Sequence, residues 1–190
     1  MANLGLSLTK CLAGSLLISM PGRDTHPLEE CVIYIYEHSP QLGAQGIVIN
    51  RQSGVTVETL LERMKFAADG SLSALQKPLY HGGLEDENGV IMLHSSEWYS
   101  SNTRAVSCDI SVSSDTFMLE KLVMGNMPTD WILCAGKCDW LPGRLEKEVA
   151  SNKWLTVPAA NQVIFSDMPA AKQWRQAIDY CTEYTVKNWF

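Results

Sequence analysis

Polar and ionisable residues that can bind or react recur where apolar segments of the chain end. Glu37 and His38 follow one β-branched run, and Asn50 and Arg51 follow the next. A guanidinium offers a rigid fork of donors to an anion, and adjacent glycines let a ligand approach backbone N–H groups. The candidate ligand-binding residues that share this placement are Glu37, His38, Asn50, Arg51, His81, Gly82, Gly83 and His94.

Three interpretations of these residues compete, and the structural one is favoured. In it, His38 and His94 satisfy backbone groups at strand ends, and Arg51 pairs with a carboxylate or with carbonyl oxygens. Polar side chains at strand ends most often have this role, because their donors and acceptors match those of the backbone. In the second interpretation, Asn50, Arg51 and the double glycine at 82–83 surround a small anion or ligand.

The third interpretation is a catalytic or metal-binding cluster of Glu37, His38, His81 and His94. No two of these ligands have the spacing of a known metal-binding motif, so we expect no metal site. The sequence also lacks a Gly-x-Ser-x-Gly elbow, a Cys/His nucleophile signature and a phosphate-binding glycine-rich loop. These absences argue against an enzyme and against a bound cofactor.

Two of the six cysteines, Cys134 and Cys138, are four residues apart. No second Cys or His pair accompanies them, and structural zinc needs four ligands, so zinc is not expected. Lys137 adjoins Cys138 and would favour a thiolate, which makes this pair the redox candidate. The alternative is that the dispersed cysteines are buried free thiols, and Cys31 and Cys108 lie in apolar, strand-like segments that fit it.

The bulk composition limits the class of protein. A chain of 190 residues with 46% hydrophobic residues fits one domain, residues 1–190, with a substantial core. A net charge of -6 with scattered Lys and Arg residues disfavours direct binding to nucleic acid or to an anionic membrane. The apolar run 12–20 is too short to span a membrane and lacks a small-residue cleavage site, so we expect a cytoplasmic protein.

The elements that must position the candidate residues begin as strands. Apolar runs predict strands at 14–20, 31–36 and 46–50, and the turn composition of 38–43 predicts a hairpin between the last two. This hairpin would place the Glu-His pair near its turn and the Asn-Arg pair at its opposite end, so the two pairs need not converge. Further strands are predicted at 78–81, 89–94, 105–112, 131–136, 154–157 and 163–165.

Helices become more frequent towards the C-terminus. They are predicted at about 57–66, 115–124 and 142–151, and from about residue 167 onward. Thr56, Ser114 and Asp167 are the expected N-caps. Helices and strands do not alternate regularly, which favours an α+β fold with a bent, mixed or antiparallel sheet and flanking helices.

The tryptophans divide into two groups by their neighbours. Trp131, Trp154 and Trp174 have apolar neighbours or helical spacing, which predicts core packing. Trp98 and Trp140 lie in polar, loop-like surroundings and are expected to be more open. An exposed tryptophan suits a protein partner at least as well as a nucleic acid.

Blocks of sequence that resemble the bacterial AlgH/YqgE family occur in order along nearly the whole chain. The resemblance implies a pseudo-barrel built from a bent sheet with surrounding helices, and a role in transcriptional regulation. Family members often have Cys where this chain has Tyr36, so thiol chemistry at that position does not transfer. The similar blocks are residues 14–21, 32–38, 43–51, 80–83, 89–94, 140–148 and 152–155.

The leading functional hypothesis is therefore a non-catalytic regulatory or interaction protein that binds one or more protein partners. The alternative is a small-ligand-binding protein or an enzyme that uses Asn50, Arg51, His81 and His94. Direct DNA binding is a third hypothesis, which predicts an affinity that falls steeply with salt.

Overall fold

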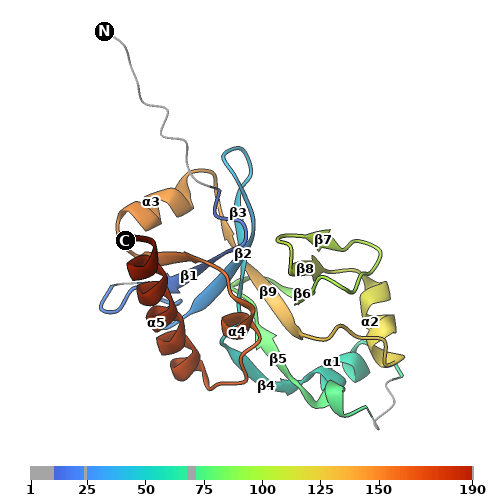
Figure 1. Cartoon of the computed structure of the whole chain (residues 1–190). Helices are drawn as coiled ribbons and strands as arrows, with labels where there is room; N and C mark the ends of the chain where they lie inside the picture. Colours follow the sequence, from blue (N-terminus) through green and yellow to red (C-terminus); the bar gives the residue numbers. More distant parts are fainter. Residues whose placement is uncertain (1–10, 24, 68–71, 190) are drawn as a thin grey trace.

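The strands of the computed structural model form one strongly curled, half-barrel sheet, with helices packed around it (Figure 1). The structure describes residues 11–23, 25–67 and 72–189. In its longest path the strand order is β10-β1-β2-β3-β9-β6-β8-β7, and β5 joins β4 to β9. The strands are β1 (Ser15–Ser19), β2 (Val32–Ser39), β3 (Gly43–Val48), β4 (Gln52–Thr56), β5 (Pro78–His81), β6 (Glu85–Ser95), β7 (Arg104–Ala105), β8 (Ile110–Ser113), β9 (Trp131–Trp140) and β10 (Trp154–Pro158).

The helices cover the two ends of this sheet. Figure 1 shows α3, α4 and α5 around β1, β2 and β10, and α1 and α2 at the end that contains β4 to β8. The predicted α+β fold with a bent sheet is confirmed. The helices are α1 (Val57–Arg63), the 3-10 helix η1 (Ser73–Gln76), α2 (Thr116–Val123), α3 (Arg144–Ala150), α4 (Asn161–Ile164) and α5 (Ala170–Trp189).

Strand β9 joins the two halves of the sheet. Near its end it pairs with β3, where Gly46 faces Cys138, while its first half lies between β6 and the parallel strand β5. Gly136 has φ of +80°, which a residue with a Cβ rarely adopts, and it lies between these two regions of pairing. The apolar composition of 131–136 follows from burial of both faces, because Ile132 and Cys134 belong to one core and Trp131 and Leu133 to another.

The predicted hairpin formed by β2 and β3 is confirmed. Glu37 faces Gln45 and His38 faces Ala44, with a bulge after Ile35. Asn50 follows β3 at the far end, so the Glu-His and Asn-Arg pairs lie at opposite ends of the hairpin, as expected.

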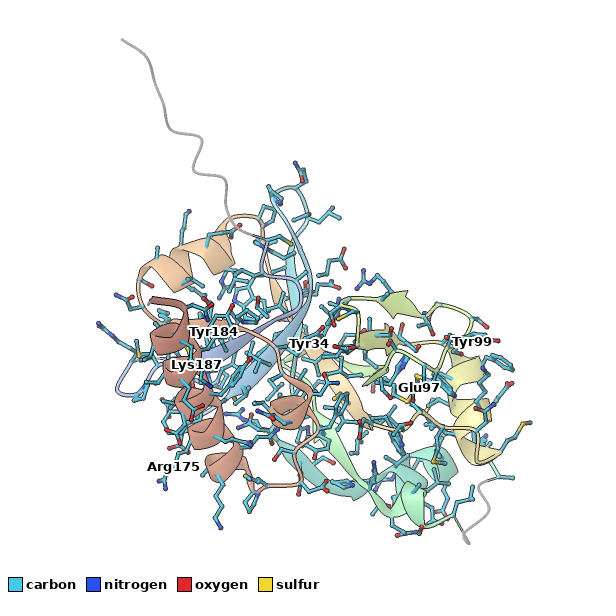
Figure 2. The ribbon with its side chains drawn as sticks, in the orientation of Figure 1. Tyr34, Glu97, Tyr99, Arg175, Tyr184 and Lys187 are labelled. Carbon is cyan, nitrogen blue, oxygen red and sulfur yellow. The ribbon has the colours of Figure 1, made fainter. Side chains whose placement is uncertain are left out.

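Burial of both faces explains the continuous apolar runs. In β1, Leu16 and Ile18 belong to the core on the inner side of the curl, while Leu17 belongs to the core beneath α3. Tyr34 of β2 lies on the inner side and is fully buried (Figure 2). In a third core, side chains of α1 and α2 pack against β6 and β9.

Four local predictions need correction. The expected strand 105–112 is a hairpin, because the Val106 and Ser107 N–H groups both donate to the Ile110 carbonyl and turn the chain. The strand predicted at 89–94 begins earlier, because the polar segment 85–88 forms the bulged start of β6. Residues 163–165 lie in and just after α4, where an extended piece was expected. Strand β4 was not predicted, since its Gln-Ser-Gly start has the composition of a turn.

The helix caps were predicted in part. The Thr56 side chain accepts from the Thr59 N–H and caps α1, as expected. Asp115, not Ser114, caps α2 by accepting from the Met118 N–H, since Ser114 instead bonds to Asn102. Within the described ranges, no helix has both the length and the apolar character needed to cross a membrane.

Candidate functional site

Asn50 and Arg51 bind the segment before β2, and Asn50 also connects it to β2 and to the start of α5. The Asn50 side chain is buried, accepts from the Val32 N–H at 2.9 Å and donates to the Glu30 carbonyl at 2.8 Å and the Ala170 carbonyl at 3.2 Å. Arg51 donates through Nη2 to the carbonyl oxygens of Pro27 at 2.8 Å and Glu29 at 3.1 Å. All of these partners are backbone groups, so these contacts fix the segment before β2 and the start of α5.

His38 connects the start of the described chain to α3. Its Nδ1 accepts from the Leu12 N–H at 2.9 Å, so the neutral ring carries its proton on Nε2. Nε2 lies 3.1 Å from the Glu146 Oε1, to which it donates. Both ring nitrogens are therefore engaged by the fold.

His94 is fully buried and organises the segment from 95 to 115. Its Nδ1 donates to the Ser95 carbonyl at 2.9 Å, and Nε2 accepts from the Ser113 hydroxyl at 2.9 Å. Burial lowers the pKa of His94, which keeps the ring neutral. Trp98 packs edge-on against it, with ring centroids 5.0 Å apart.

The double glycine lets the chain before β6 run against β9. A Cβ on Gly82 would lie 2.3 Å from the Gly136 carbonyl oxygen, and one on Gly83 would lie 1.9 Å from the Lys137 carbonyl carbon. The space beside these glycines is therefore occupied by the backbone of β9, where the ligand-binding interpretation would place a ligand. His81 is exposed, and its N–H donates to the Arg51 carbonyl.

The structure does not join these residues into one site. The hydrogen-bond partners of His38, His94 and Asn50 have no residue in common. Glu37 differs from them, because it lines an open groove. Among the described residues, no group of three or more His, Cys, Asp or Glu side chains is placed to hold a metal ion.

The redox candidates Cys134 and Cys138 are buried free thiols. Burial raises the pKa of Cys138 to about 12 and that of Cys134 well above its ordinary value, which opposes thiolate formation. The Lys137 ammonium pairs with Asp139 at 3.0 Å. Cys108 is exposed in the turn between β7 and β8, so the expectation that it lies in a buried strand is wrong.

The expectation that Trp98 and Trp140 are open is also wrong, since both are buried. The Trp98 indole donates to Asn126 at 2.9 Å. Trp140 and Trp154 each donate at 2.9 Å to Oε2 of Glu148, which lies in α3. The local composition gave no signal for this burial, because the hydrogen-bond partners Asn126 and Glu148 lie 28 and 8 residues away from their indoles.

The first surface that sequence reasoning missed is a groove between the β2–β3 hairpin and strands β6, β7 and β8. It encloses about 440 Å³ and is called the hairpin groove below. Arg104 crosses its edge, with Nη1 2.8 Å from Oε2 of Glu37 and the guanidinium carbon 5.3 Å from the centre of the Tyr36 ring. No sequence pattern indicates this groove, because Glu37 and Arg104, which pair across it, are 67 residues apart.

The second missed surface lies on α2 and the loop before β7. Tyr99, Phe117 and Met124 are 72%, 47% and 79% exposed, and with Lys121 they are called the aromatic face below. The Lys121 Nζ lies 4.6 Å from the Tyr99 ring centre and 5.2 Å from that of Phe117, so both rings lie beside this ammonium. Figure 2 shows Tyr99 at the edge of the molecule beside α2.

Comparison with known proteins gives consistent matches over most of the chain. A family model described as AlgH-like matches residues 16–184. A UPF0301 protein of Shewanella denitrificans is 36% identical over 168 residues, 87% of this chain and 89% of that protein. A UPF0301 protein of Thioalkalivibrio sulfidiphilus is 35% identical over 161 residues, 85% of this chain and 84% of that protein.

Two solved structures are similar to this one. The solution structure of the AlgH protein from Pseudomonas aeruginosa has a TM-score of 0.75 and 29% sequence identity, covering 90% of this chain and 89% of that one. The crystal structure of a Corynebacterium diphtheriae protein has a TM-score of 0.68 at 19% identity, covering 87% and 85%. The second match shows likeness of fold alone.

Proposed function

The chain belongs to the AlgH-like family, and from that premise we propose that it is a non-catalytic interaction protein of the cytoplasm that regulates by binding a protein partner. The observation that carries the proposal is the aromatic face. Tyrosine, phenylalanine and methionine are enriched at protein interfaces, and clustered exposed apolar side chains mark such sites. The free state of all six cysteines supports a reducing compartment.

The aromatic face also indicates the chemistry of the partner. Lys121 donates to the Tyr99 carbonyl at 2.6 Å, which leaves further N–H donors of its ammonium for another acceptor. Within the described part of the chain, Lys121 has no carboxylate at ion-pair distance, unlike Arg104 and Lys137. We therefore assign to the aromatic face a partner segment that presents an apolar side chain beside a carboxylate.

Regulation through a protein partner fits the charge of the chain better than direct binding to DNA. The net charge is -6, and a DNA-binding surface would need clustered basic residues. The aromatic face contributes one cation, Lys121, whereas phosphate contacts normally require several.

The test is site-specific crosslinking followed by measured affinity. A photoreactive residue at Phe117 is expected to capture one defined protein in cells, whereas the same residue at Leu42, which is 74% exposed in the β2–β3 turn, is not. With the purified pair, Lys121→Glu should weaken binding about tenfold or more, since it places like charges opposite each other. Changing the partner's carboxylate to lysine should restore the affinity.

Equal capture from Leu42, or an unchanged dissociation constant for Lys121→Glu with normal thermal unfolding, would overturn the proposal. Salt-sensitive binding of the wild type to duplex DNA would favour the rival hypothesis instead.

A further inference from the structure

The hairpin groove is independent of the aromatic face and has the features of a small-molecule site. Its volume of about 440 Å³ lies in the range of ligand pockets. Hydrogen-bonding side chains from strands that are distant in sequence face it, and it also has apolar lining from Val90, Ile91 and Val112. We propose that this groove binds a small zwitterionic ligand, an amino acid or a short peptide, with its carboxylate on Arg104 and its ammonium on Asp86.

The guanidinium of Arg104 is placed to receive a carboxylate. It contacts Glu37 through one nitrogen, Nη1, and its side chain remains 46% exposed. The other donors of its fork are available for a second carboxylate, and the Tyr36 ring beneath it fixes its plane. The ion pair with Glu37 is not buried, so adjusting it for a ligand costs little.

Asp86 supplies the opposite charge. It is the first bulged residue of β6, with φ of +52°, and its carboxylate lies against Gly89. A Cβ on Gly89 would lie 2.4 Å from the Asp86 Oδ2, so glycine leaves the room that this carboxylate occupies. Among the described residues, no cation lies within ion-pair distance of Asp86, which leaves its charge available to a ligand.

The charge balance of the lining selects a zwitterion over a simple anion. The cation Arg104 faces the groove together with two carboxylates, Glu37 and Asp86, while the second cation of the lining, Lys137, is paired with Asp139. A phosphate would be attracted by Arg104 but repelled by both carboxylates. A zwitterion instead places its carboxylate against Arg104 and its ammonium against Asp86.

The groove wall is held in place before any ligand binds. The Tyr36 hydroxyl donates to Gln45 at 3.1 Å, and Gln45 donates to Asp139 at 3.1 Å. Asp139 also pairs with Lys137 at 3.0 Å, which neutralises that cation. Such a connected wall reduces the ordering cost of binding.

The experiment is titration of the full chain with leucine and with alanyl-leucine, followed by amide chemical shifts and calorimetry. Shifts are expected at Gln45, Gly89 and Ser113, with a higher thermal unfolding midpoint when ligand is present. N-acetyl-leucine amide has the same apolar group without either charge, and should not bind. Arg104→Gln and Asp86→Asn should each weaken binding about tenfold, whereas Arg175→Gln on α5 should not (Figure 2).

Several outcomes would overturn this assignment. One is that inorganic phosphate produces the chemical-shift changes and neither leucine nor alanyl-leucine does. The others are that N-acetyl-leucine amide binds, or that Asp86→Asn binds the zwitterions with the affinity of the wild type. Lys121→Glu should retain ligand binding, so failure at the groove is distinguishable from failure at the aromatic face. If Arg104→Gln does not fold, Asp86→Asn provides the test, since Asp86 is exposed.

Discussion

At the scale of single residues, Glu148 shows how a charged side chain can serve the fold. Its carboxylate accepts from the indoles of Trp140 and Trp154 on one oxygen and from Arg144 Nε at 3.2 Å on the other. Desolvation raises its pKa, but the three hydrogen bonds lower it by more, so the net pKa lies below the ordinary value. The same logic applies to Asn50 and His94, because leaving a buried polar group unpaired costs free energy.

Replacing Glu148 with alanine should therefore destabilise the protein. Both indole N–H groups would lose their acceptor while remaining largely buried, at a cost of about 3 kcal/mol in the free energy of unfolding. Urea unfolding of the purified variant measures this loss. Glu183→Ala, which removes an exposed ion pair with Lys187 in α5, is the control and should change stability by less than about 0.5 kcal/mol.

The contribution of Glu148 should also depend on pH with a defined sign. Because its folded pKa is lowered, its stabilising charge is fully present above the unfolded pKa and is lost as the pH falls through the folded value. The stability difference between wild type and Glu148→Gln should thus shrink in acid. A difference that grows as the pH falls would contradict this account.

At the scale of elements, the connection between β5 and β6 depends on close backbone approach. Gly82 and Gly83 pass over Gly136 and Lys137 of β9 at distances that leave no room for a Cβ. The Gly82 N–H donates to the Ala135 carbonyl at 2.7 Å, and its own carbonyl accepts from Val48 at 2.7 Å. The double glycine thereby links β3, β5 and β9.

Gly83→Ala is expected to destabilise the fold by about 3 kcal/mol or more, since the clash is with backbone and not with a flexible side chain. Chemical denaturation and soluble expression measure the effect. Gly22→Ala is the matched control, because Gly22 has φ of +70° but nothing lies within 4 Å of an added Cβ. It should cost only the left-handed backbone strain of about 1 kcal/mol. If Gly83→Ala is as stable as Gly22→Ala, the backbone between β5 and β6 can shift to accommodate a Cβ at little cost in free energy.

At the scale of the whole molecule, β9 couples the two halves of the sheet. It contacts β3, β5 and β6, and Leu133 and Cys134 at its centre are fully buried. Strand β7 is a two-residue edge strand with both residues exposed. Because β9 and β7 differ in burial and in strand pairing, we expect the free energy of local opening to be higher for β9 than for β7.

Hydrogen exchange should reveal this hierarchy. Amides of β9 are expected to exchange only by global unfolding and to be the slowest of the chain, while those of β4 and β7 exchange by local opening. Exchange followed by mass spectrometry or NMR at increasing denaturant measures both regimes. Exchange in β9 as fast as in β7 would indicate that the two halves of the sheet open separately.

Several features were predictable because they depend on local pattern. The β2–β3 hairpin, the strand at 131–136, the Thr56 cap and the long C-terminal helix follow from periodicity and from residue preferences at turns and caps. The hairpin also separates His38 from Asn50 by geometry alone. The bulge at 85–90 was missed because it depends on pairing with β9, which is remote in sequence. The hairpin at 104–113 is local, and it was missed because residues 105–112 alternate like one continuous strand.

By itself, the sequence determined the α+β class, most of the elements and the separation of the polar pairs, since these depend on residues close together in the chain. Only the tertiary structure decided that Trp98 and Trp140 are buried, and which groups hydrogen-bond to Asn50, Arg51, His38 and His94. It also brought Glu37 to Arg104 and placed the rings of Tyr99 and Phe117 beside Lys121. The physical reason is that burial and side-chain partners are set by which strands and helices pack together, and that packing joins residues far apart in sequence.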